Sequence, residues 1–589
     1  MSPHAAAVSR SARVALPALA CCILAGIAAT ANASHDPSRT ATVFVHGFDP
    51  AGATQTGVFG RDEVDPLLEQ AAALLGLPTT GQPGGLERAN VVTTTRYYGD
   101  TPPPYYDGTD LADLQAVTAA WGGGVPRYAL IVAKYARHVL EVSGADQVNI
   151  MSASFGSLIA RWLIEKDVEH LASQGRIARW LSVEGVVAGN WAASQEDLVG
   201  LSELVLAPTI DVEHMGYDWV EAHLHAPRRE ADSAWYASIL LGQVGSTEDR
   251  LHERALTAAM LSRGAYQPND GVQGLWDARF ETVTNQALFL GRPPTWSVFH
   301  DTHYSLQANQ AAWAQAVVFL TQSRRVTVTL RAATVDHIHE PSGPFLDLRP
   351  AEVVFQSRVR SPALAARWGI TAAVSELTLE GGAPPLRRFD HDGSRLEFNQ
   401  VLFDDFVLAG ETALDLELWA EEIDLELRYG VSETLLQPYF QFLGGGFLQV
   451  SALQPGTYSF ATTDWHGDLE VQIFDYPFGA PTDAATPSSR YFGDTALLVS
   501  PNPFISQVRI RPAPTAAGSS SGNLISAGDA TLRIYDASGR LLRALVNQAE
   551  QEFVWDGRDG RGKTLPAGVY FYELITPQAV FTGRGQRLR

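Results

Sequence analysis

The pattern of apolar and polar positions changes along the chain and indicates more than one kind of structure. Between about residues 40 and 322, short apolar runs alternate with segments of helical periodicity. Such alternation is typical of a mostly parallel sheet with crossover helices on both faces. From about 325 to 485 the helical period is lost, and apolar and polar residues alternate between turn residues. The pattern therefore predicts a multidomain protein, with an α/β domain followed by all-β sandwich domains.

Individual elements follow from the same pattern. In the α/β region we expect strands at 41–45, 88–98, 148–151, 180–187 and 296–299, and helices at 109–142, from 158 onward and at 309–320. The stretch from about 190 to 262 is expected to be a helical, aromatic insertion that either acts as a lid or simply packs against the domain. In the all-β region, strands are expected at 326–330, 352–355 and 414–418.

A serine lies between the strand that ends at Met151 and the helix that continues from Leu158. Ser154 has the small residues Ser152 and Gly156 two positions to either side. A serine in so tight a turn is held in a strained backbone conformation with its Oγ projecting above the sheet, and bulky neighbours at these positions would collide. The segment is therefore suited to present a nucleophile.

The segment 152–156, Ser-Ala-Ser-Phe-Gly, resembles the G-x-S-x-G nucleophile elbow of the α/β-hydrolase superfamily, particularly its lipase and esterase branch. It departs from that pattern at Ser152, which stands where the family has glycine. His46-Gly47-Phe48, after the strand 41–45, is similar to the loop that helps build the oxyanion hole in this family. The resemblance implies that the N–H groups of Phe48 and Phe155 are the oxyanion donors; the alternative is that His46-Gly47 is only a turn.

A serine nucleophile needs a base, and that base needs a carboxylate to orient it. In the family these follow the serine in the order acid, then histidine. Asn269-Asp270-Gly271 is similar to the loop that carries the acid in many lipases, which implies that Asp270 is the acid, although Asn-Asp-Gly is also an ordinary turn. Glu184 and Asp211 are the alternative acids.

The base is expected on the loop after the strand 296–299 and before the helix 309–320. His303 resembles the family histidine that precedes an aromatic residue and a leucine, and His300, closer to the strand, is the alternative. Asp301 is a further candidate partner within the site. The resemblance thus implies a Ser154–His303–Asp270 triad that needs neither a metal nor an organic cofactor.

Composition limits the classes of partner. The chain has 589 residues, 46% of them hydrophobic and 18% charged, which describes a globular protein of several domains. Its formal net charge of −22 argues against nucleic acid or an anionic membrane as a partner.

The first 33 residues are expected to be a secretory signal peptide. Arg10 and Arg13 precede an apolar run that ends near an Ala-Asn-Ala sequence at 31–33. Both cysteines, Cys21 and Cys22, lie in this segment, so its removal would leave a mature chain without a disulfide. The alternative is a lipoprotein anchored at Cys22. No other stretch approaches the length of a membrane span. We therefore expect an exported protein.

The last hundred residues carry an ordered set of short motifs, which a linker at 514–523 interrupts after the first. Pro-Asn-Pro-Phe begins at 501, Ile-Tyr-Asp at 534, Trp-Asp-Gly at 555 and Pro-Ala-Gly-Val-Tyr-Phe at 566. Together they resemble the immunoglobulin-like C-terminal module of type IX secretion sorting domains and of flagellar hook-capping proteins. This resemblance implies the export machinery as a partner and a secreted or cell-surface location, with the module either removed or anchored.

Acidic residues recur in the all-β region, and calcium is a candidate ligand for them because it prefers oxygen donors. Their spacing matches no known calcium loop, and solvated turns are the alternative. The residues are Asp336, Asp347, Asp390, Asp392, Asp404 and Asp405.

These expectations combine into one hypothesis. Residues 34–323 would form the catalytic domain, 324–490 a β-sandwich region and 491–589 the sorting module. The protein would be an exported serine hydrolase acting on carboxylic esters or lipids. An acyltransferase, amidase or polyester hydrolase on the same fold remains an alternative, as does a non-catalytic cell-surface binding protein.

Overall fold

The computed structural model describes most of the chain after residue 35. The described ranges are 36–195, 210–224, 239–247, 255–263, 267–280, 294–338, 351–378, 387–429, 434–476, 495–500, 507–512, 530–535, 541–547, 553–558, 563–566, 568–575 and 580–587. The expected signal peptide lies outside these ranges and stays a prediction. Within them, no helix is both long and apolar enough to cross a bilayer.

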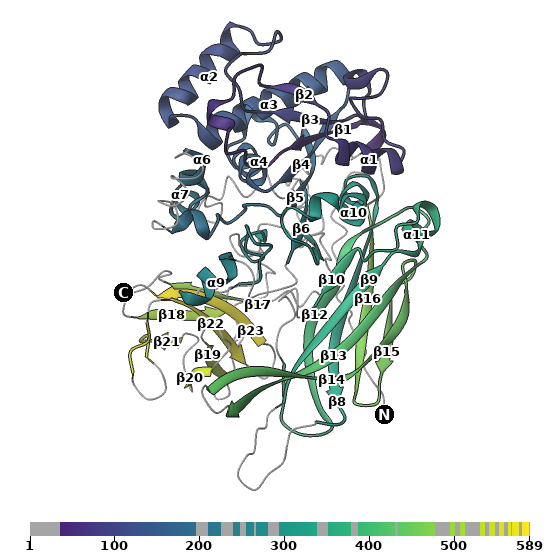
Figure 1. Ribbon diagram of the computed structural model, residues 1–589, viewed down its shortest axis with the longest axis vertical. Coiled ribbons are helices and arrows are strands. Elements are labelled where there is room, and N and C mark those ends of the chain that lie inside the picture. Colours follow the sequence, from purple (N-terminus) through teal and green to yellow (C-terminus); the bar gives the residue numbers. More distant parts are fainter. Residues whose placement is uncertain are drawn as a thin grey trace, which may run out of the picture.

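The largest sheet has eleven strands in the order β15-β16-β8-β12-β7-β6-β5-β4-β1-β3-β2 (Figure 1). Its parallel part runs from β7 to β3, and β2 adds an antiparallel edge. The strands of this part are β1 (Thr40–Val45), β2 (Arg61–Glu63), β3 (Val92–Arg96), β4 (Gln147–Ala153), β5 (Ile177–Val183), β6 (Leu240–Ser246) and β7 (Thr295–Phe299).

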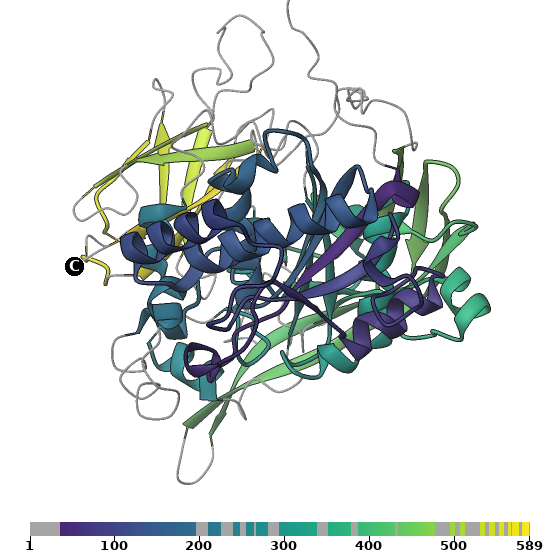
Figure 2. The same ribbon diagram turned by 90° about the horizontal axis from the view of Figure 1, so that it is seen from above.

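Helices cover both faces of the parallel part, and the sequence of β1 shows why. Successive side chains of a strand point to opposite faces. Ala41, Val43 and Val45 pack in one core with helices α3 and α4, whereas Phe44 packs in the other core with α1 and α10. The helices of this domain are α1 (Pro66–Leu74), α2 (Gly108–Trp121), α3 (Gly124–Ser143), α4 (Phe155–Glu165), α6 (Ile210–Met215), α7 (Tyr217–His223), α9 (Ala255–Ser262) and α10 (Gln310–Thr321). Figure 2 shows helices of this part of the chain, in purple, blue and teal, overlying the sheet. The predicted α/β-hydrolase fold is confirmed.

Two local predictions are wrong. The single helix expected at 109–142 is two helices, α2 and α3, because Gly122, Gly123 and Gly124 adopt φ values of 72°, 118° and 62° that end one helix and redirect the chain. The stretch 190–262, expected to be a helical insertion, is helical at α6, α7 and α9 but also contains β6, which lies between β5 and β7 in the sheet.

The all-β region forms the predicted sandwich but shares a sheet with the parallel part. β8 (Arg324–Val335), β12 (Ser394–Val407), β15 (Gly456–Ala461) and β16 (Trp465–Asp475) extend the eleven-stranded sheet. The junction is at Asp404 of β12, which pairs with Trp296 of β7. Strand pairing therefore continues across the expected boundary at residue 324.

A second sheet packs on this extension. It has the order β10-β9-β13-β14, with β11 also paired to β9. Its Phe355 contacts Phe398 and Trp465 of the first sheet at ring-centroid distances of 5.5 and 4.9 Å. The elements are β9 (Ala351–Arg360), α11 (Pro362–Trp368), β10 (Ser375–Leu377), β11 (Arg387–Phe389), β13 (Ala413–Tyr429) and β14 (Thr434–Ser451).

A third sheet of seven strands forms the C-terminal part, in the order β20-β19-β22-β23-β17-β18-β21. It has its own core, in which Trp555 is fully buried against Tyr570 and Tyr572. The strands are β17 (Thr495–Ser500), β18 (Val508–Pro512), β19 (Ala530–Tyr535), β20 (Leu541–Asn547), β21 (Phe553–Trp555), β22 (Gly568–Ile575) and β23 (Val580–Arg587).

Candidate active site

Ser154 occupies the sharp turn that its sequence context predicts. It is the single residue between β4 and α4, and its φ of 50° is unfavourable for any residue except glycine. Such strain persists only where the surrounding structure enforces it. Here the Ser154 N–H donates to the Val183 carbonyl (2.9 Å), and the Ser154 carbonyl accepts from the N–H groups of Ser157 and Val186 (both 3.0 Å). The serine is therefore fixed by the end of β5, the first turn of α4 and the loop that follows β5.

The two small neighbours are needed for different reasons. A Cβ on Gly156 would overlap the carbonyl oxygens of Val45 and His46. Ser152, which stands where the family has glycine, is fully buried, and its hydroxyl accepts from Trp180 Nε1 (2.8 Å) and lies 3.0 Å from Ser157 Oγ. The serine is tolerated because this polar pocket satisfies its hydroxyl.

The residues predicted as oxyanion donors belong to two segments close to Ser154. Val45 pairs with Ser152 in parallel register, so the loop after β1 begins beside the elbow. A Cβ on Gly47 would lie 3.1 Å from Ser154 Cβ, which places the Gly47–Phe48 backbone against the serine. Phe155 is the first residue of α4, where backbone N–H groups have no acceptor inside the helix. The Gly47–Phe48 backbone and the first residue of α4 therefore lie close to Ser154, and the oxyanion role of the Phe48 and Phe155 N–H groups stays a prediction.

Tyr97 supports this loop, and the sequence analysis did not identify it. Its hydroxyl donates to the carbonyls of Gly47 (2.7 Å) and His46 (3.0 Å), and its ring stacks on the His46 imidazole at a centroid distance of 4.1 Å. A tyrosine at the end of β3 carries no motif, so only the fold reveals this contact.

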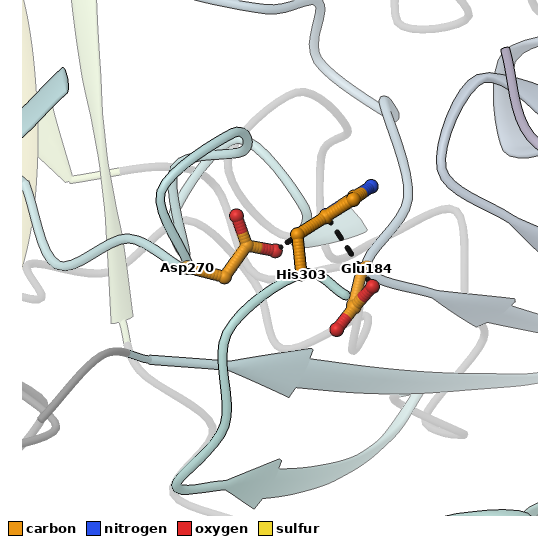
Figure 3. A group of neighbouring side chains, drawn as sticks. All are labelled: Glu184, Asp270 and His303. Carbon is orange, nitrogen blue, oxygen red and sulfur yellow. Dashed lines mark hydrogen bonds and ion pairs between the residues drawn. The ribbon is translucent and has the colours of Figure 1, made fainter. Parts of the chain in front are cut away.

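His303 and Asp270 meet as predicted (Figure 3). His303 Nδ1 donates to Asp270 Oδ2 at 2.8 Å, and both side chains are buried. The backbone holds the pair as well, because the His303 N–H donates to the Asp270 carbonyl (2.9 Å). Asp270 Oδ1 accepts from the N–H groups of Val272 (2.9 Å) and Gln273 (2.6 Å), which orient the carboxylate.

Glu184, an alternative acid in the sequence analysis, lies at the same histidine. Its Oε2 is 3.3 Å from His303 Nδ1, and its Oε1 accepts from the Ser246 hydroxyl at 2.7 Å. Figure 3 shows the imidazole contacting both carboxyl groups through one edge, with its other nitrogen pointing away from them. That second nitrogen, Nε2, is the atom that a general base would use.

The electrostatics of this group favour a charged histidine. Burial by itself lowers the pKa of His303, but the charge of Asp270, its hydrogen bond and the charge of Glu184 outweigh burial and raise the pKa to about 9. Burial raises the pKa of Glu184 well above its ordinary value, and the neighbouring Asp270 adds to this effect while His303 opposes it.

The other candidates occupy different places. Asp211 is buried beside the hydroxyls of Tyr98 (3.2 Å) and Tyr128 (3.5 Å), and burial raises its pKa to about 6. Asp301 accepts from Asn309 Nδ2 (2.6 Å) and Ser305 Oγ (3.0 Å), so it braces the loop that carries His303. His303, not His300, is the histidine that contacts the carboxyl groups.

Ser154 and His303 come from the same edge of the sheet. β4, β5, β6 and β7 are parallel neighbours, and Ser154, Glu184, Asp270 and His303 follow them in that order. The described contacts include no hydrogen bond from Ser154 Oγ to His303. The loop after β5 connects them, since Val186 bonds Ser154 and Glu184 faces His303.

Glu184, Asp270 and His303 also form a candidate metal-binding group, since one ligand atom of each lies within 4.8 Å of the others. The hydrogen bonds fit an acid–base cluster better. Nδ1 faces both carboxyl groups and needs its proton to bond to them, while Asp270 Oδ1 already accepts two backbone N–H groups. We therefore derive no chemistry through a metal here.

The acids considered for calcium have protein partners at four of the described positions, including Asp392, whose Oδ1 accepts from the Ile338 N–H at 2.7 Å. Asp404 is buried with Arg325 Nε at 2.7 Å, and Asp405 accepts from Ser297 Oγ at 2.8 Å. Asp336 contacts His466 Nδ1 at 2.9 Å. Asp390 and Asp392 lie in an exposed turn, and Asp347 lies outside the described residues. Calcium binding stays a prediction that these contacts do not favour.

Comparisons with known proteins identify one segment. Residues 514–575 match the family model described as the FlgD Ig-like domain, inside the predicted C-terminal module. This match confirms the immunoglobulin-like module, and the sorting role stays a prediction. No curated protein matches the chain by sequence.

Several solved structures resemble parts of the chain. The Bacillus licheniformis lipase BlEst2 in its propeptide form has 10% identity and a TM-score of 0.31, with 94% of each chain covered. The mature form has 14% identity and a TM-score of 0.29, covering 46% of this chain and 88% of that one. The metagenomic carboxyl esterase MGS0156 has 15% identity and a TM-score of 0.28, covering 46% and 67%. Similarities this weak carry no argument about activity, which has to come from the site itself.

Proposed function

We propose that the protein is a serine hydrolase that cleaves carboxylic esters, with Ser154 as nucleophile, His303 as base and Asp270 as the acid that orients it. The observation that carries this proposal is the combination of a serine held at a φ of 50° between a parallel strand and a helix with a buried His–Asp pair from neighbouring strands. A strained serine turn and a buried His–Asp pair are two independent requirements of this chemistry.

Each residue has a defined task in the proposed reaction. Ser154 Oγ attacks the ester carbonyl while His303 Nε2 takes its proton, and the imidazolium is stabilised by Asp270 at Nδ1. The N–H groups of Phe48 and Phe155 bind the oxyanion, each contributing roughly 3–4 kcal/mol. The imidazolium then protonates the leaving alcohol, and water activated by His303 hydrolyses the acyl-enzyme. A hydrogen bond between nucleophile and base is often long before substrate binds and tightens in the complex with substrate.

The first experiment is hydrolysis of p-nitrophenyl esters of increasing acyl length by the purified protein, beside Ser154→Ala. We expect turnover in the wild type and a loss of about 10⁶-fold in kcat in the variant. Equal turnover in both proteins would contradict the assignment of Ser154. The optimum of the chain-length series would separate a lipase from a short-chain esterase, and no turnover in either protein would favour acyl transfer, amide or polyester substrates, or a binding role.

We also propose that the protein is exported to the medium or the cell surface through its N-terminal segment and its C-terminal module. The basic and apolar pattern of residues 1–33 and the match at 514–575 support this proposal. Peptide mass spectrometry of the mature protein should find an N-terminus at Ser34, and a chain lacking residues 491–589 should fail to reach the surface. A mature protein that keeps residue 1, or a truncated chain that is exported normally, would contradict it.

A further inference from the structure

His303 faces two buried carboxyl groups where the proposed chemistry needs only one. Asp270 Oδ2 is 2.8 Å and Glu184 Oε2 is 3.3 Å from the same nitrogen, Nδ1. The side chains of Glu184 and Asp270 are 4% and 2% exposed, so both lie in the same enclosed space. Both carboxylates are therefore within reach of a hydrogen bond from Nδ1–H.

Glu184 depends on His303, the proposed base, for its ion pair. Among the described residues, His303 is the only ion-pair partner of Glu184. A buried carboxylate usually destabilises a protein unless it is paired. Glu184 has a main-chain φ of 46°, which is also unfavourable, and it directly follows β5, the neighbour of β4 in the sheet. The fold thus keeps the buried carboxylate of Glu184 in a strained backbone conformation, with His303 as its charged partner.

Ser246 connects the two acids. Its hydroxyl is 2.7 Å from Glu184 Oε1 and 3.3 Å from Asp270 Oδ2. Ser246 is the last residue of β6, which lies between β5, the strand before Glu184, and β7, the strand before His303. This contact holds Glu184 beside Asp270 and at Nδ1.

We propose that Glu184 is a second acid for His303, a positioning residue that shares the Nδ1 proton with Asp270 and holds the imidazole when Asp270 is lost. This inference rests on the proposed function, because it concerns the base of that reaction. As His303 takes the proton of Ser154, both carboxylates face the resulting imidazolium, and removing one leaves the other in place.

The charges around the histidine predict a second effect. The groups facing Glu184 are His303 and Asp301 from the loop after β7, Asp270 from the loop after β6, and Ser246. Burial lowers the pKa of His303, and Asp270 and then Glu184 raise it. Removing the charge of Glu184 should therefore lower the pKa of His303 and make it a weaker base that is neutral at lower pH.

A double-mutant cycle tests the proposal with p-nitrophenyl butyrate as the substrate. The proteins are the wild type, Asp270→Asn, Glu184→Gln and the double variant, with Ser154→Ala beside them. Loss of the acid in a triad without a substitute lowers kcat about 10⁴-fold. We expect Asp270→Asn to lose only about 10- to 100-fold and the double variant to reach about 10⁴-fold. Asp211→Asn, another buried acid, should not deepen the loss when combined with Asp270→Asn.

The pH profile of Glu184→Gln separates positioning from a purely structural role. We expect the rise of kcat/KM with pH to move to lower pH in this variant, whereas a structural defect would lower the whole profile without moving it. The proposal is overturned if Asp270→Asn alone is as slow as the double variant, or if the profile of Glu184→Gln does not move. Turnover in Ser154→Ala equal to the wild type would instead contradict the proposed function, so the two failures are distinct.

Discussion

Two His–Asp pairs of nearly equal length lie in different halves of the eleven-stranded sheet. His303 contacts Asp270 at 2.8 Å at the end of the parallel half, and His466 contacts Asp336 at 2.9 Å in the antiparallel half. The first pair has side chains 7% and 2% exposed, the second 45% and 36%. The length of a His–Asp contact alone therefore does not distinguish the proposed base from an ordinary surface histidine. The burial of the two side chains and the groups around them make the distinction.

The direction of the strands explains why the halves differ. In the parallel half, the carboxyl ends of β4, β5, β6 and β7 meet at one edge, so residues far apart in sequence converge there. In the antiparallel half, successive strands end at opposite edges, and charged residues such as Arg325 and Asp404 join neighbouring strands within the sheet. One half gathers reactive groups, and the other provides the packing that supports them.

The largest difference between the two pairs should appear when each histidine is replaced by alanine in turn. His303→Ala is expected to lower kcat for ester hydrolysis about 10⁶-fold, because the nucleophile loses its base. His466→Ala removes an exposed pair far from the elbow in the sheet order and should leave kcat within a factor of two. Equal losses of kcat in the two variants would contradict the assignment of the base to the parallel half.

The junction between the halves should matter for stability. Asp404 is buried with Arg325 and accepts from Thr327 Oγ1 (2.9 Å), on the strand that pairs with β7. Asp404→Ala leaves Arg325 without this partner and should reduce the free energy of unfolding by about 3–5 kcal/mol.

The matched control for the junction is Asp475→Ala, which removes the exposed pair with Arg324 and should change stability by about 0–1 kcal/mol. Urea unfolding with a tryptophan signal measures both variants. Similar values for the two would mean that the halves are not joined through β12.

A glycine comparison tests the elbow. Gly156→Ala introduces a Cβ against the carbonyls of Val45 and His46, so we expect a loss of about 1–3 kcal/mol in stability together with reduced kcat. Gly456→Ala, on β15, meets only the Tyr458 ring at 3.7 Å and should be nearly neutral. Thermal melts and ester turnover of both variants check this, and an unimpaired Gly156→Ala would contradict the close approach of β1 to the elbow.

The last prediction concerns pH and needs no change in the site. His303 must be neutral to act as a base, and its pKa is raised to about 9. We therefore expect kcat/KM to rise about tenfold per pH unit up to about pH 9 and then level off. Asp336→Asn, in the exposed pair, should leave this profile unchanged. A profile that already levels off near pH 6.5 would contradict the claim that the charges of Asp270 and Glu184 raise the pKa of His303.

The triad candidates could be predicted because each lies in a local motif at the end of a strand or in a turn. β6 could not be predicted from the sequence, because its glycines interrupt the apolar pattern of a strand. Gly242 leaves room for Phe319, and Gly245 leaves room for Leu275 and Trp296. The contact between Glu184 and His303 depends on the spatial order of β5, β6 and β7, which one sequence does not display. For the same reason the pairing of β12 with β7 across more than a hundred residues was not foreseen.

The most direct test of the central claim is covalent labelling of the protein with a fluorophosphonate, which phosphonylates an activated serine. Intact-mass and peptide analysis should find one adduct, on Ser154, which forms far more slowly in His303→Ala and at the wild-type rate in His466→Ala. Labelling at another serine, or none at a pH where His303 is neutral, would contradict the assignment of Ser154 as the nucleophile.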